Sequence, residues 1–293
     1  TMRTSHLTEV LPWFFVTVII AVIPLSVSSI PCINRNPRIV GGIETEKHEF
    51  PFIVSLKIRG GHFCGATIIH ERWILTAGHC TCNGLNKFMK ATQIQGVIGL
   101  HRMSNHTNIV LSSQEKPSAV QINFKNVVPH PKYKCEMVHN DIALLELERS
   151  VRLSINIQPS CLPLDSSKQI DEDAVATVFG WGWTDENQET GQRSDILRKA
   201  NVKVWSNKQC EKSYQLNGNP KMIVTDTQIC AGINTGGVDS CWTDSGGPLI
   251  SREYVLIGIV STGVGCGRPG LPGIYTRVSK YITWIKSTIL NQI

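Results

Sequence analysis

Short runs of β-branched and aliphatic residues recur along the chain from Ile39 onward. Four of the clearest span residues 52–56, 66–69, 174–178 and 255–260. Gly, Pro and Asn residues separate these runs, as expected for short strands joined by turns. Strands of this length and spacing are typical of β-sandwiches and β-barrels. The pattern therefore predicts an all-β protein.

The last stretch of the chain has a different period. Apolar residues fall at intervals of three or four, at Val278, Ile282, Ile285 and Ile289. This spacing places them on one face of a helix. We expect a terminal amphipathic helix over residues 278–290.

The N-terminal region has the features of a secretion signal. Arg3 precedes a nearly uninterrupted apolar run over residues 11–27, and small serine residues follow it. This order predicts a signal peptide over residues 1–29, cleaved near position 29. An uncleaved signal anchor is the alternative, since the run is close to the length that spans a bilayer. A short polar stretch, residues 30–38, comes next.

Composition narrows the class of protein. The chain has 293 residues, 41% hydrophobic and 18% charged, which describes a globular protein with a substantial core. The net charge of +6 is spread along the chain, without a basic cluster that would predict nucleic-acid binding. No clustered basic or amphipathic surface segment supports a membrane-acting defence or venom protein either.

The ten cysteines predict disulfides in an oxidising compartment. The Cys80-Thr-Cys82 spacing is too tight for a zinc site and has no second pair beside it. A glycosylation sequon at Asn105 agrees with a secreted, extracellular protein.

Three separate segments contain candidate catalytic groups. Ser245 lies in a glycine-rich stretch, residues 236–248, where backbone N–H groups could face a developing oxyanion. Serine needs a base, and His79 beside Cys80 offers one. Asp141, directly before an apolar run, could orient the imidazole. Each segment alone has a structural explanation: a solvated histidine, a capping aspartate or a turn.

Together, in the order His, Asp, Ser, these segments resemble the chymotrypsin/trypsin family of serine peptidases. The resemblance extends from Ile39 to about Ile289. It implies two six-stranded antiparallel β-barrels with a C-terminal helix. The implied peptidase domain covers residues 39–293, with barrels at about 39–160 and 161–277. The implied catalytic residues are His79, Asp141 and Ser245.

The resemblance also implies activation by proteolysis. Arg38 and Ile39 begin the sequence Arg-Ile-Val-Gly-Gly, which is similar to the family's activation site. Cleavage between them would free the α-amino group of Ile39. That amine would pair with the buried carboxylate of Asp244 and order the neighbouring loops.

The family's primary specificity pocket has its counterparts here as well. By resemblance Asp239, six residues before Ser245, lies at the base of the pocket, and Gly263 and Gly273 line its walls. Ser240 and Ser261 complete the implied substrate-binding set. A buried carboxylate selects a cation, so the resemblance implies cleavage after Arg or Lys.

Five disulfides are expected. Four pairs follow from the resemblance: Cys64–Cys80, Cys210–Cys230, Cys241–Cys266, and Cys32–Cys161, which would keep the propeptide attached. Cys82 and Cys135 are outside the common framework and flank the segments of His79 and Asp141. We expect these two cysteines to pair with each other.

The chain departs from the family at the oxyanion loop. Two residues before the nucleophile the family has glycine, whose N–H acts with that of Ser245, and this chain has Thr243. A β-branched residue cannot adopt a positive φ without strain. Trp242 beside it is bulky, and Thr262 stands where the family usually has tryptophan.

These departures keep an alternative open: a weakly active or inactive secreted homologue that acts as a binding protein or cofactor. The expected partners of an active enzyme are protein substrates with Arg or Lys at the cleavage site, an activating peptidase and serpin-type or other protein inhibitors. We expect a monomer with no cofactor. We also expect no metal, because the loop that matches the family's calcium site, about residues 99–115, has Glu115 as its one acid.

Overall fold

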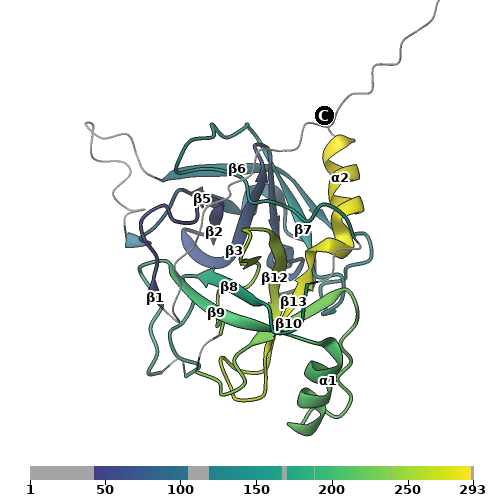
Figure 1. The fold of residues 1–293 in the computed structure, drawn as a ribbon. Coiled ribbons are helices and arrows are strands. Elements are labelled where there is room, and N and C mark those ends of the chain that lie inside the picture. The colour runs from purple at the N-terminus through teal and green to yellow at the C-terminus, as the bar shows by residue number, and fades with distance from the viewer. Residues whose placement is uncertain (1–42, 105–118, 167–169, 188, 238, 292–293) are drawn as a thin grey trace, which may run out of the picture.

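The computed structural model describes residues 43–104, 119–166, 170–187, 189–237 and 239–291 (Figure 1). The expected signal peptide and propeptide lie outside these residues, as do Cys32, Arg38, Ile39 and Asn105. In the described part of the chain, none of the helices has the length and apolar character needed to cross a membrane.

The first half of the described chain forms a closed antiparallel barrel in the strand order β2-β3-β4-β7-β6-β5. Its strands are β2 (Ile53–Ile58), β3 (Gly61–His70), β4 (Trp73–Thr76), β5 (Gln95–Ile98), β6 (Val120–Pro129) and β7 (Ala143–Leu147). Both β4 and β7 are fully buried, and they pair side by side. This pairing brings the ends of β4 and β7 together.

A second antiparallel barrel follows, built from β8 (Val175–Gly180), β9 (Arg198–Trp205), β10 (Gln228–Gly232), β11 (Pro248–Ser251), β12 (Leu256–Thr262) and β13 (Gly273–Arg277). Its order is β9-β10-β13-β12-β11-β8, and pairing of β8 with β9 closes it. The short strand β1 (Ile43–Glu44) joins the outside of this barrel at β9. The prediction of two six-stranded barrels is confirmed.

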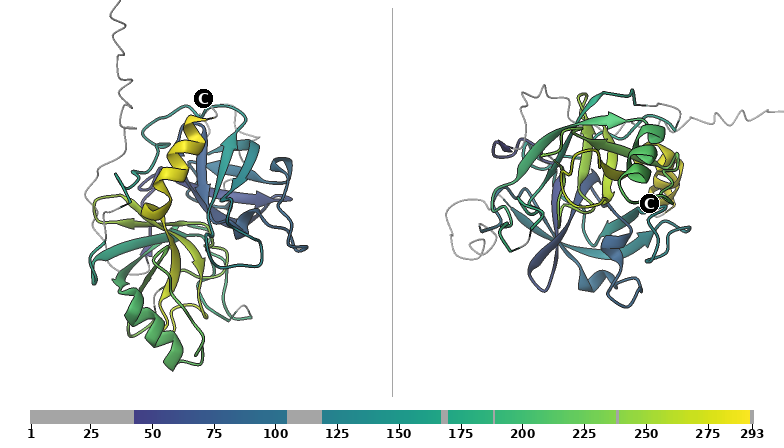
Figure 2. Two further views of the ribbon diagram at one scale, coloured as in Figure 1. Left: turned by 90° about the vertical axis from the view of Figure 1, so that its right-hand side faces the viewer. Right: turned by 90° about the horizontal axis from the view of Figure 1, so that it is seen from below.

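Two α-helices of the described part of the chain lie outside the barrels. Helix α1 (Asn207–Leu216) extends from the second barrel, and α2 (Ile282–Leu290) runs beside the first (Figures 1 and 2). A 3-10 turn, Val278–Tyr281, precedes α2, so the predicted C-terminal helix is present with an irregular start. Ser206 caps α1 through a hydrogen bond from the N–H of Gln209.

One apolar core connects the barrels. Phe50 and Phe52 from the first half pack with Phe179 of β8, and the rings of Phe50 and Phe179 are 4.0 Å apart. The buried face of α2, including Ile282 and Ile285, belongs to the same core. The barrels are therefore packed against each other, and loops from both meet at their junction.

Four disulfides lie among the described residues: Cys64–Cys80, Cys82–Cys135, Cys210–Cys230 and Cys241–Cys266. All four are expected pairs. The Cα atoms of Cys82 and Cys135 are 5.8 Å apart, within the range for a disulfide. The expected partner of Cys161 lies outside the described residues.

Candidate active site

His79 and Asp141 meet where β4 ends and β7 begins. His79 opens a 3-10 turn shortly after β4, and Asp141 lies two residues before β7. Two hydrogen bonds join them: His79 Nδ1 lies 2.8 Å from Asp141 Oδ2, and the backbone N–H of His79 donates to Asp141 Oδ1 over 2.8 Å. The pairing of two buried strands therefore places a carboxylate on both the ring and the backbone of His79.

Asp141 is surrounded by donors. Its side chain is 3% exposed, and Oδ2 also accepts a 2.5 Å hydrogen bond from the hydroxyl of Ser261, at the end of β12 in the second barrel. Burial by itself would lower the pKa of His79, but the charge and hydrogen bond of Asp141 outweigh it and raise that pKa above its ordinary value. The pair is thus arranged to hold a proton on Nδ1.

Ser245 lies in a tight loop that both barrels hold. Its carbonyl accepts a 2.8 Å hydrogen bond from the N–H of Gly65 in β3, while the N–H of Gly246 donates to Val260 of β12 over 2.8 Å. Gly246 has φ of 77°, and a Cβ there would collide with Thr76 and lie 3.0 Å from Cys80 Sγ. The loop of Ser245 therefore lies against the segment that contains His79.

The last contact of the expected triad is not formed. His79 Nε2 lies 3.7 Å from Cys80 Sγ, and among the described residues no hydrogen bond joins it to the Ser245 hydroxyl. Catalytic hydrogen bonds are often long without substrate and tighten when it binds. The structure brings His79 and Asp141 into direct contact and leaves Ser245 in the adjoining loop.

Thr243 adopts the conformation that its side chain disfavours. Its φ is 74°, and its buried Oγ1 has no hydrogen-bond partner. The carbonyl of Thr243 accepts a 3.2 Å hydrogen bond from His62 Nε2, and His62 Nδ1 lies 2.9 Å from the hydroxyl of Ser55. Burial lowers the pKa of His62 to about 4, so its ring is neutral at pH 7. A neutral histidine thus holds the strained peptide.

Asp239 lies in a polar recess beside this loop. Its carboxylate accepts hydrogen bonds from the N–H of Ser240 (2.8 Å) and from that of Gly267 (3.3 Å). Burial raises the pKa of Asp239 to about 7, against the effect of those hydrogen bonds. A Cβ on Gly273 would lie 3.0 Å from Asp239 Oδ1, whereas one on Gly263 would meet its nearest atoms at 3.9 Å. A side chain at residue 273 would therefore crowd the carboxylate, whereas the surroundings of Gly263 are looser.

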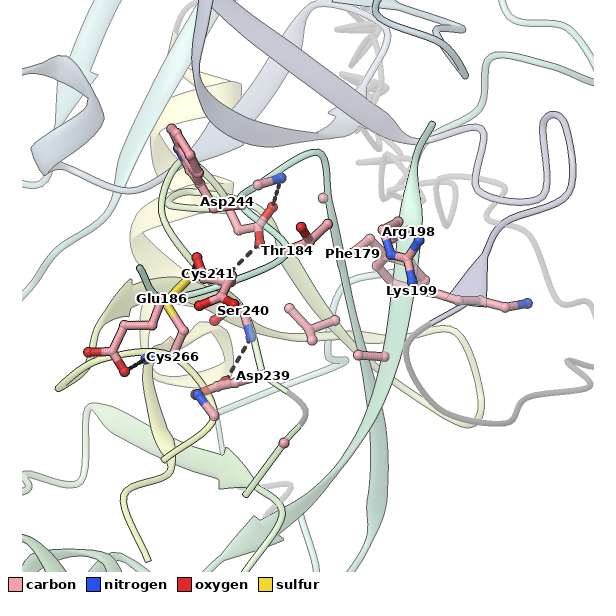
Figure 3. A pocket seen from close by; sticks show the side chains of 18 of the residues that line it. Phe179, Thr184, Glu186, Arg198, Lys199, Asp239, Ser240, Cys241, Asp244 and Cys266 are labelled. Carbon is pink, nitrogen blue, oxygen red and sulfur yellow. Dashed lines mark hydrogen bonds between the residues drawn. A yellow bond between two sulfur atoms is a disulfide. The ribbon is translucent and has the colours of Figure 1, made fainter. Parts of the chain in front are cut away.

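Asp244 lines, together with Asp239, a cavity of about 570 Å³ whose lining also includes Arg198, Lys199 and Ala200 (Figure 3). Its carboxylate is buried and accepts hydrogen bonds from the N–H of Gly182 (2.8 Å) and Cys241 (2.9 Å). Burial raises the pKa of Asp244 to about 6. No cation of the described residues forms an ion pair with it.

One cluster of possible metal ligands lies here, Cys64, His79 and Cys80. The two sulfur atoms are joined in a disulfide, so neither can supply the thiolate that binds metal. Within the described residues this cluster does not fit a metal ion.

Three contacts of the site could not be predicted from the sequence. Ser261 was expected to bind substrate, and its hydroxyl bonds Asp141. His62 was not singled out, although it holds Thr243. Glu186, which approaches the Asp239 recess, gave no signal in the sequence. The position of His62, two residues before the cysteine that pairs with Cys80, is only a weak sequence signal for a contact with the site.

Two packed β-barrels with a histidine–aspartate pair and a serine loop at their junction define a two-barrel serine hydrolase. Comparison with known families matches the chain to the Trypsin family over residues 39–285. Trypsin 5G1 of Aedes aegypti is 40% identical over 255 residues, which cover 87% of this chain and 86% of that protein. The chain belongs to the trypsin family of serine peptidases.

Proposed function

We propose that this chain is a secreted serine endopeptidase, made as a zymogen, that cleaves peptide bonds after Arg or Lys. The observation that carries the proposal is the His79–Asp141 pair, bonded at both the ring and the backbone and fixed by Ser261 from the other barrel. The adjoining loop presents Ser245. A histidine with a purely structural role would not need a partner carboxylate on which three donors converge.

The proposed chemistry proceeds by an acyl-enzyme. His79 Nε2 takes the proton of the Ser245 hydroxyl as Oγ attacks the substrate carbonyl, and Asp141 stabilises the imidazolium. The N–H groups of Thr243 and Ser245 face the oxyanion. His79 then gives the proton to the leaving amine as the peptide C–N bond breaks. Water, deprotonated by His79, attacks the acyl group and releases Ser245.

Preference for Arg and Lys rests on Asp239. Its carboxylate has two backbone donors, and Gly273 leaves beside it the space that a Cβ would fill. A cationic side chain entering that space would supply the charge that the buried carboxylate lacks, which stabilises its ionised form.

Activation by cleavage between Arg38 and Ile39 is supported by the surroundings of Asp244. Strand β1 starts at Ile43, opposite Lys199, and Lys199 lines the same cavity as Asp244. The four residues 39–42 can span up to about 13 Å, enough to reach inward from there. A new α-amino group at Ile39 would give the buried carboxylate of Asp244 its cation.

Secretion is supported by the four disulfides and by the apolar N-terminal run. Active relatives outside the cell would meet protein substrates, an activating peptidase and protein inhibitors, and we propose the same partners here.

A binding protein without activity is the second candidate, and Thr243 favours it. A strained peptide at the oxyanion loop could lose the N–H orientation that the reaction needs, at a cost of about 10²–10³-fold in turnover. Activity measurements decide between the two candidates.

The decisive experiment combines labelling with a cleavage profile. After cleavage at Arg38 is confirmed by mass spectrometry, the protein is treated with a neutral fluorophosphonate and, separately, with a peptide library. We expect one label on Ser245 and cleavage after Arg and Lys. Absence of the label in correctly cut protein would establish the binding-protein alternative.

Benzamidine binding to the activated protein is expected to weaken below pH 7. This aromatic amidinium needs the ionised carboxylate of Asp239, whose pKa burial raises to about 7 in the empty recess. Above that pH the carboxylate is charged and Kd should be constant. Below it, Kd should rise about tenfold per pH unit as the carboxyl is protonated. Isothermal titration calorimetry between pH 5 and 8.5 measures this.

The control for benzamidine binding is Asp239→Ser. Without the carboxylate we expect Kd to be higher by on the order of 10²–10³-fold at pH 8, with the step near pH 7 lost. A Kd of the unsubstituted protein that stays flat from pH 5 to 8 would contradict the assignment of Asp239.

Replacing Thr243 by glycine is expected to stabilise the protein. Glycine adopts a φ near 74° without strain, and the change removes a buried hydroxyl that has no partner. We expect the free energy of unfolding to rise by about 1–3 kcal/mol, with kcat unchanged or higher. Denaturant unfolding and steady-state kinetics test both parts.

Thr243→Ala separates the two causes of that stabilisation. It removes the hydroxyl and keeps a Cβ at positive φ, so its stability should fall between that of threonine and glycine. Equal stability of the alanine and glycine variants would show that the backbone at residue 243 is not strained.

A further inference from the structure

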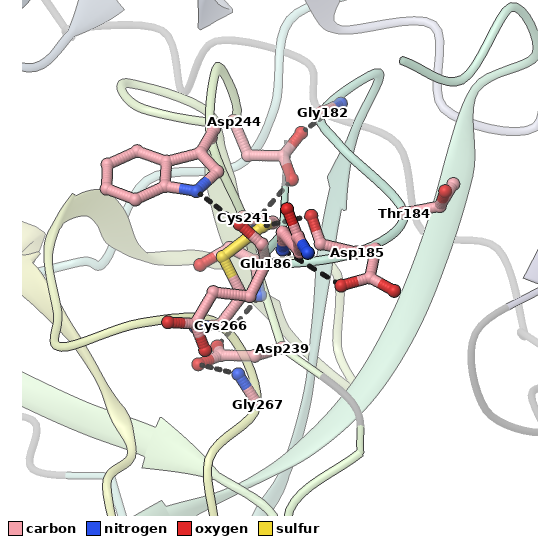
Figure 4. Close-up of a disulfide and its surroundings, with 12 residues drawn as sticks. Gly182, Thr184, Asp185, Glu186, Asp239, Cys241, Asp244, Cys266 and Gly267 are labelled. Atoms are coloured by element: carbon pink, nitrogen blue, oxygen red, sulfur yellow. Dashed lines mark hydrogen bonds between the residues drawn. A yellow bond between two sulfur atoms is a disulfide. The ribbon is translucent and has the colours of Figure 1, made fainter. Parts of the chain in front are cut away.

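Glu186 joins the connection between β8 and β9 to residues 265–268, the segment that borders Asp239. It lies in the connection between β8 and β9, and its carboxylate accepts hydrogen bonds from the backbone N–H of Cys266 (3.4 Å) and from Arg268 Nε (2.9 Å). Arg268 Nη2 donates to the other carboxylate oxygen, which makes the ion pair bidentate. Figure 4 shows Glu186 beside the Cys241–Cys266 disulfide.

The segment that Glu186 holds is flexible by composition. Gly265 and Gly267 have φ of 73° and 63°, in the region open mainly to glycine. The N–H of Gly267 is one of the two donors to Asp239, over a long 3.3 Å. Glu186 binds the residues on both sides of Gly267. A small shift of this segment would move that donor toward or away from Asp239.

Glu186 also contacts the loop that leads to Ser245. Its backbone carbonyl accepts a 3.3 Å hydrogen bond from the indole N–H of Trp242. The neighbouring Cys241 forms the disulfide with Cys266. One residue is thus bonded to the wall of the recess through its side chain and to the candidate oxyanion loop through its backbone.

We propose that Glu186 is a positioning residue for substrate binding: with Arg268 it fixes the 265–268 segment so that the Asp239 recess fits a cationic side chain. This inference rests on the function proposed above and names a residue that sets its specificity. An exposed ion pair contributes little stability by itself, so its removal should alter the recess rather than unfold the protein.

The test compares Glu186→Ala with a matched control, Asp195→Ala. Asp195 is an exposed carboxylate in the same β8–β9 connection, and it too accepts a backbone N–H, from Ser104, and an arginine, Arg102. Three quantities are measured on activated protein: benzamidine Kd, KM and kcat on an arginine anilide, and the rate at which a neutral fluorophosphonate labels Ser245.

For Glu186→Ala we expect benzamidine Kd and KM to rise about three- to tenfold, with kcat and the labelling rate changed less than twofold. Arg268→Ala should reproduce the effect, and Arg268→Lys should fall in between because it keeps the charge without the bidentate geometry. Asp195→Ala should leave all three quantities unchanged.

Two results would overturn the inference: unchanged benzamidine binding in both Glu186→Ala and Arg268→Ala, or equal losses in Glu186→Ala and Asp195→Ala. Failure of the proposed function looks different. In that case the unsubstituted protein, correctly cut, neither takes the label nor binds benzamidine, and the inference falls with it.

Discussion

Ser245→Ala is expected to lower kcat of the activated protein about 10⁶-fold, the loss typical of removing a nucleophile that acts as a unit with its base. The fold should be unaffected. The structural contacts of residue 245 are made by its backbone, whose carbonyl accepts from Gly65, and alanine keeps them. Benzamidine Kd should also stay the same, because Asp239 is untouched. Steady-state kinetics on an arginine anilide and calorimetry give the two values.

The control for this prediction is Ser287→Ala on α2, where the hydroxyl donates to the carbonyl of Trp284 on the exposed side of the helix. We expect full activity from it. If Ser245→Ala kept more than a tenth of the activity of the unsubstituted protein, another residue would be the nucleophile, and the proposed mechanism would fail.

The two barrels could be predicted from the sequence because their strands follow from local residue patterns and their closure from the resemblance to a known family. The apolar runs at residues 66–69 and 255–260 lie in β3 and in the β12 region, where alternating or continuous burial makes β-branched residues favourable. The apolar residues at intervals of three or four before residue 290 predict α2. Closure into two six-stranded barrels came from the family resemblance, since strand pairing is not a local property.

The contacts around the candidate site were harder to predict. Ser261 and Asp141 are 120 residues apart, and His62 and Thr243 are 181 apart. No local pattern marks such pairs, because the barrels bring them together only after folding. Residue types alone could not show that the hydroxyl of Ser261 donates to the Asp141 carboxylate.

The conformation of Thr243 could not be predicted from local preference. A β-branched residue where the family usually has glycine predicts backbone strain at a positive φ. The sequence does not show how the protein accommodates that strain. The structure keeps the positive φ and holds the carbonyl through neutral His62, rather than moving the peptide. Tertiary contacts thus override a local preference, as they often do at functional sites.

Asp141→Asn is expected to lower kcat about 10⁴-fold without changing the fold. Asp141 accepts from the backbone N–H of His79 through Oδ1 and from the ring through Oδ2. A backbone N–H can only donate, so the single oxygen of asparagine must stay with it. The amide NH₂ then faces Nδ1, which must give up its proton and become an acceptor.

That exchange places the ring proton on Nε2, the atom that would have to accept the proton of Ser245. The loss of charge should also lower the pKa of His79, because Asp141 is what raises it against burial. We therefore expect the acid limb of the kcat profile to move to lower pH while kcat falls. Steady-state rates between pH 5 and 10 measure both effects.

Ser261→Ala provides the matched control, because it removes one donor to Asp141 Oδ2 and leaves both contacts with His79 in place. Its kcat should fall less than about tenfold, the worth of one hydrogen bond. An Asp141→Asn variant with as much activity as Ser261→Ala would mean that the tautomer of His79 does not limit the reaction. Since the backbone N–H of His79 fixes which way the asparagine turns, a loss far larger than that of Ser261→Ala is the outcome that this geometry requires.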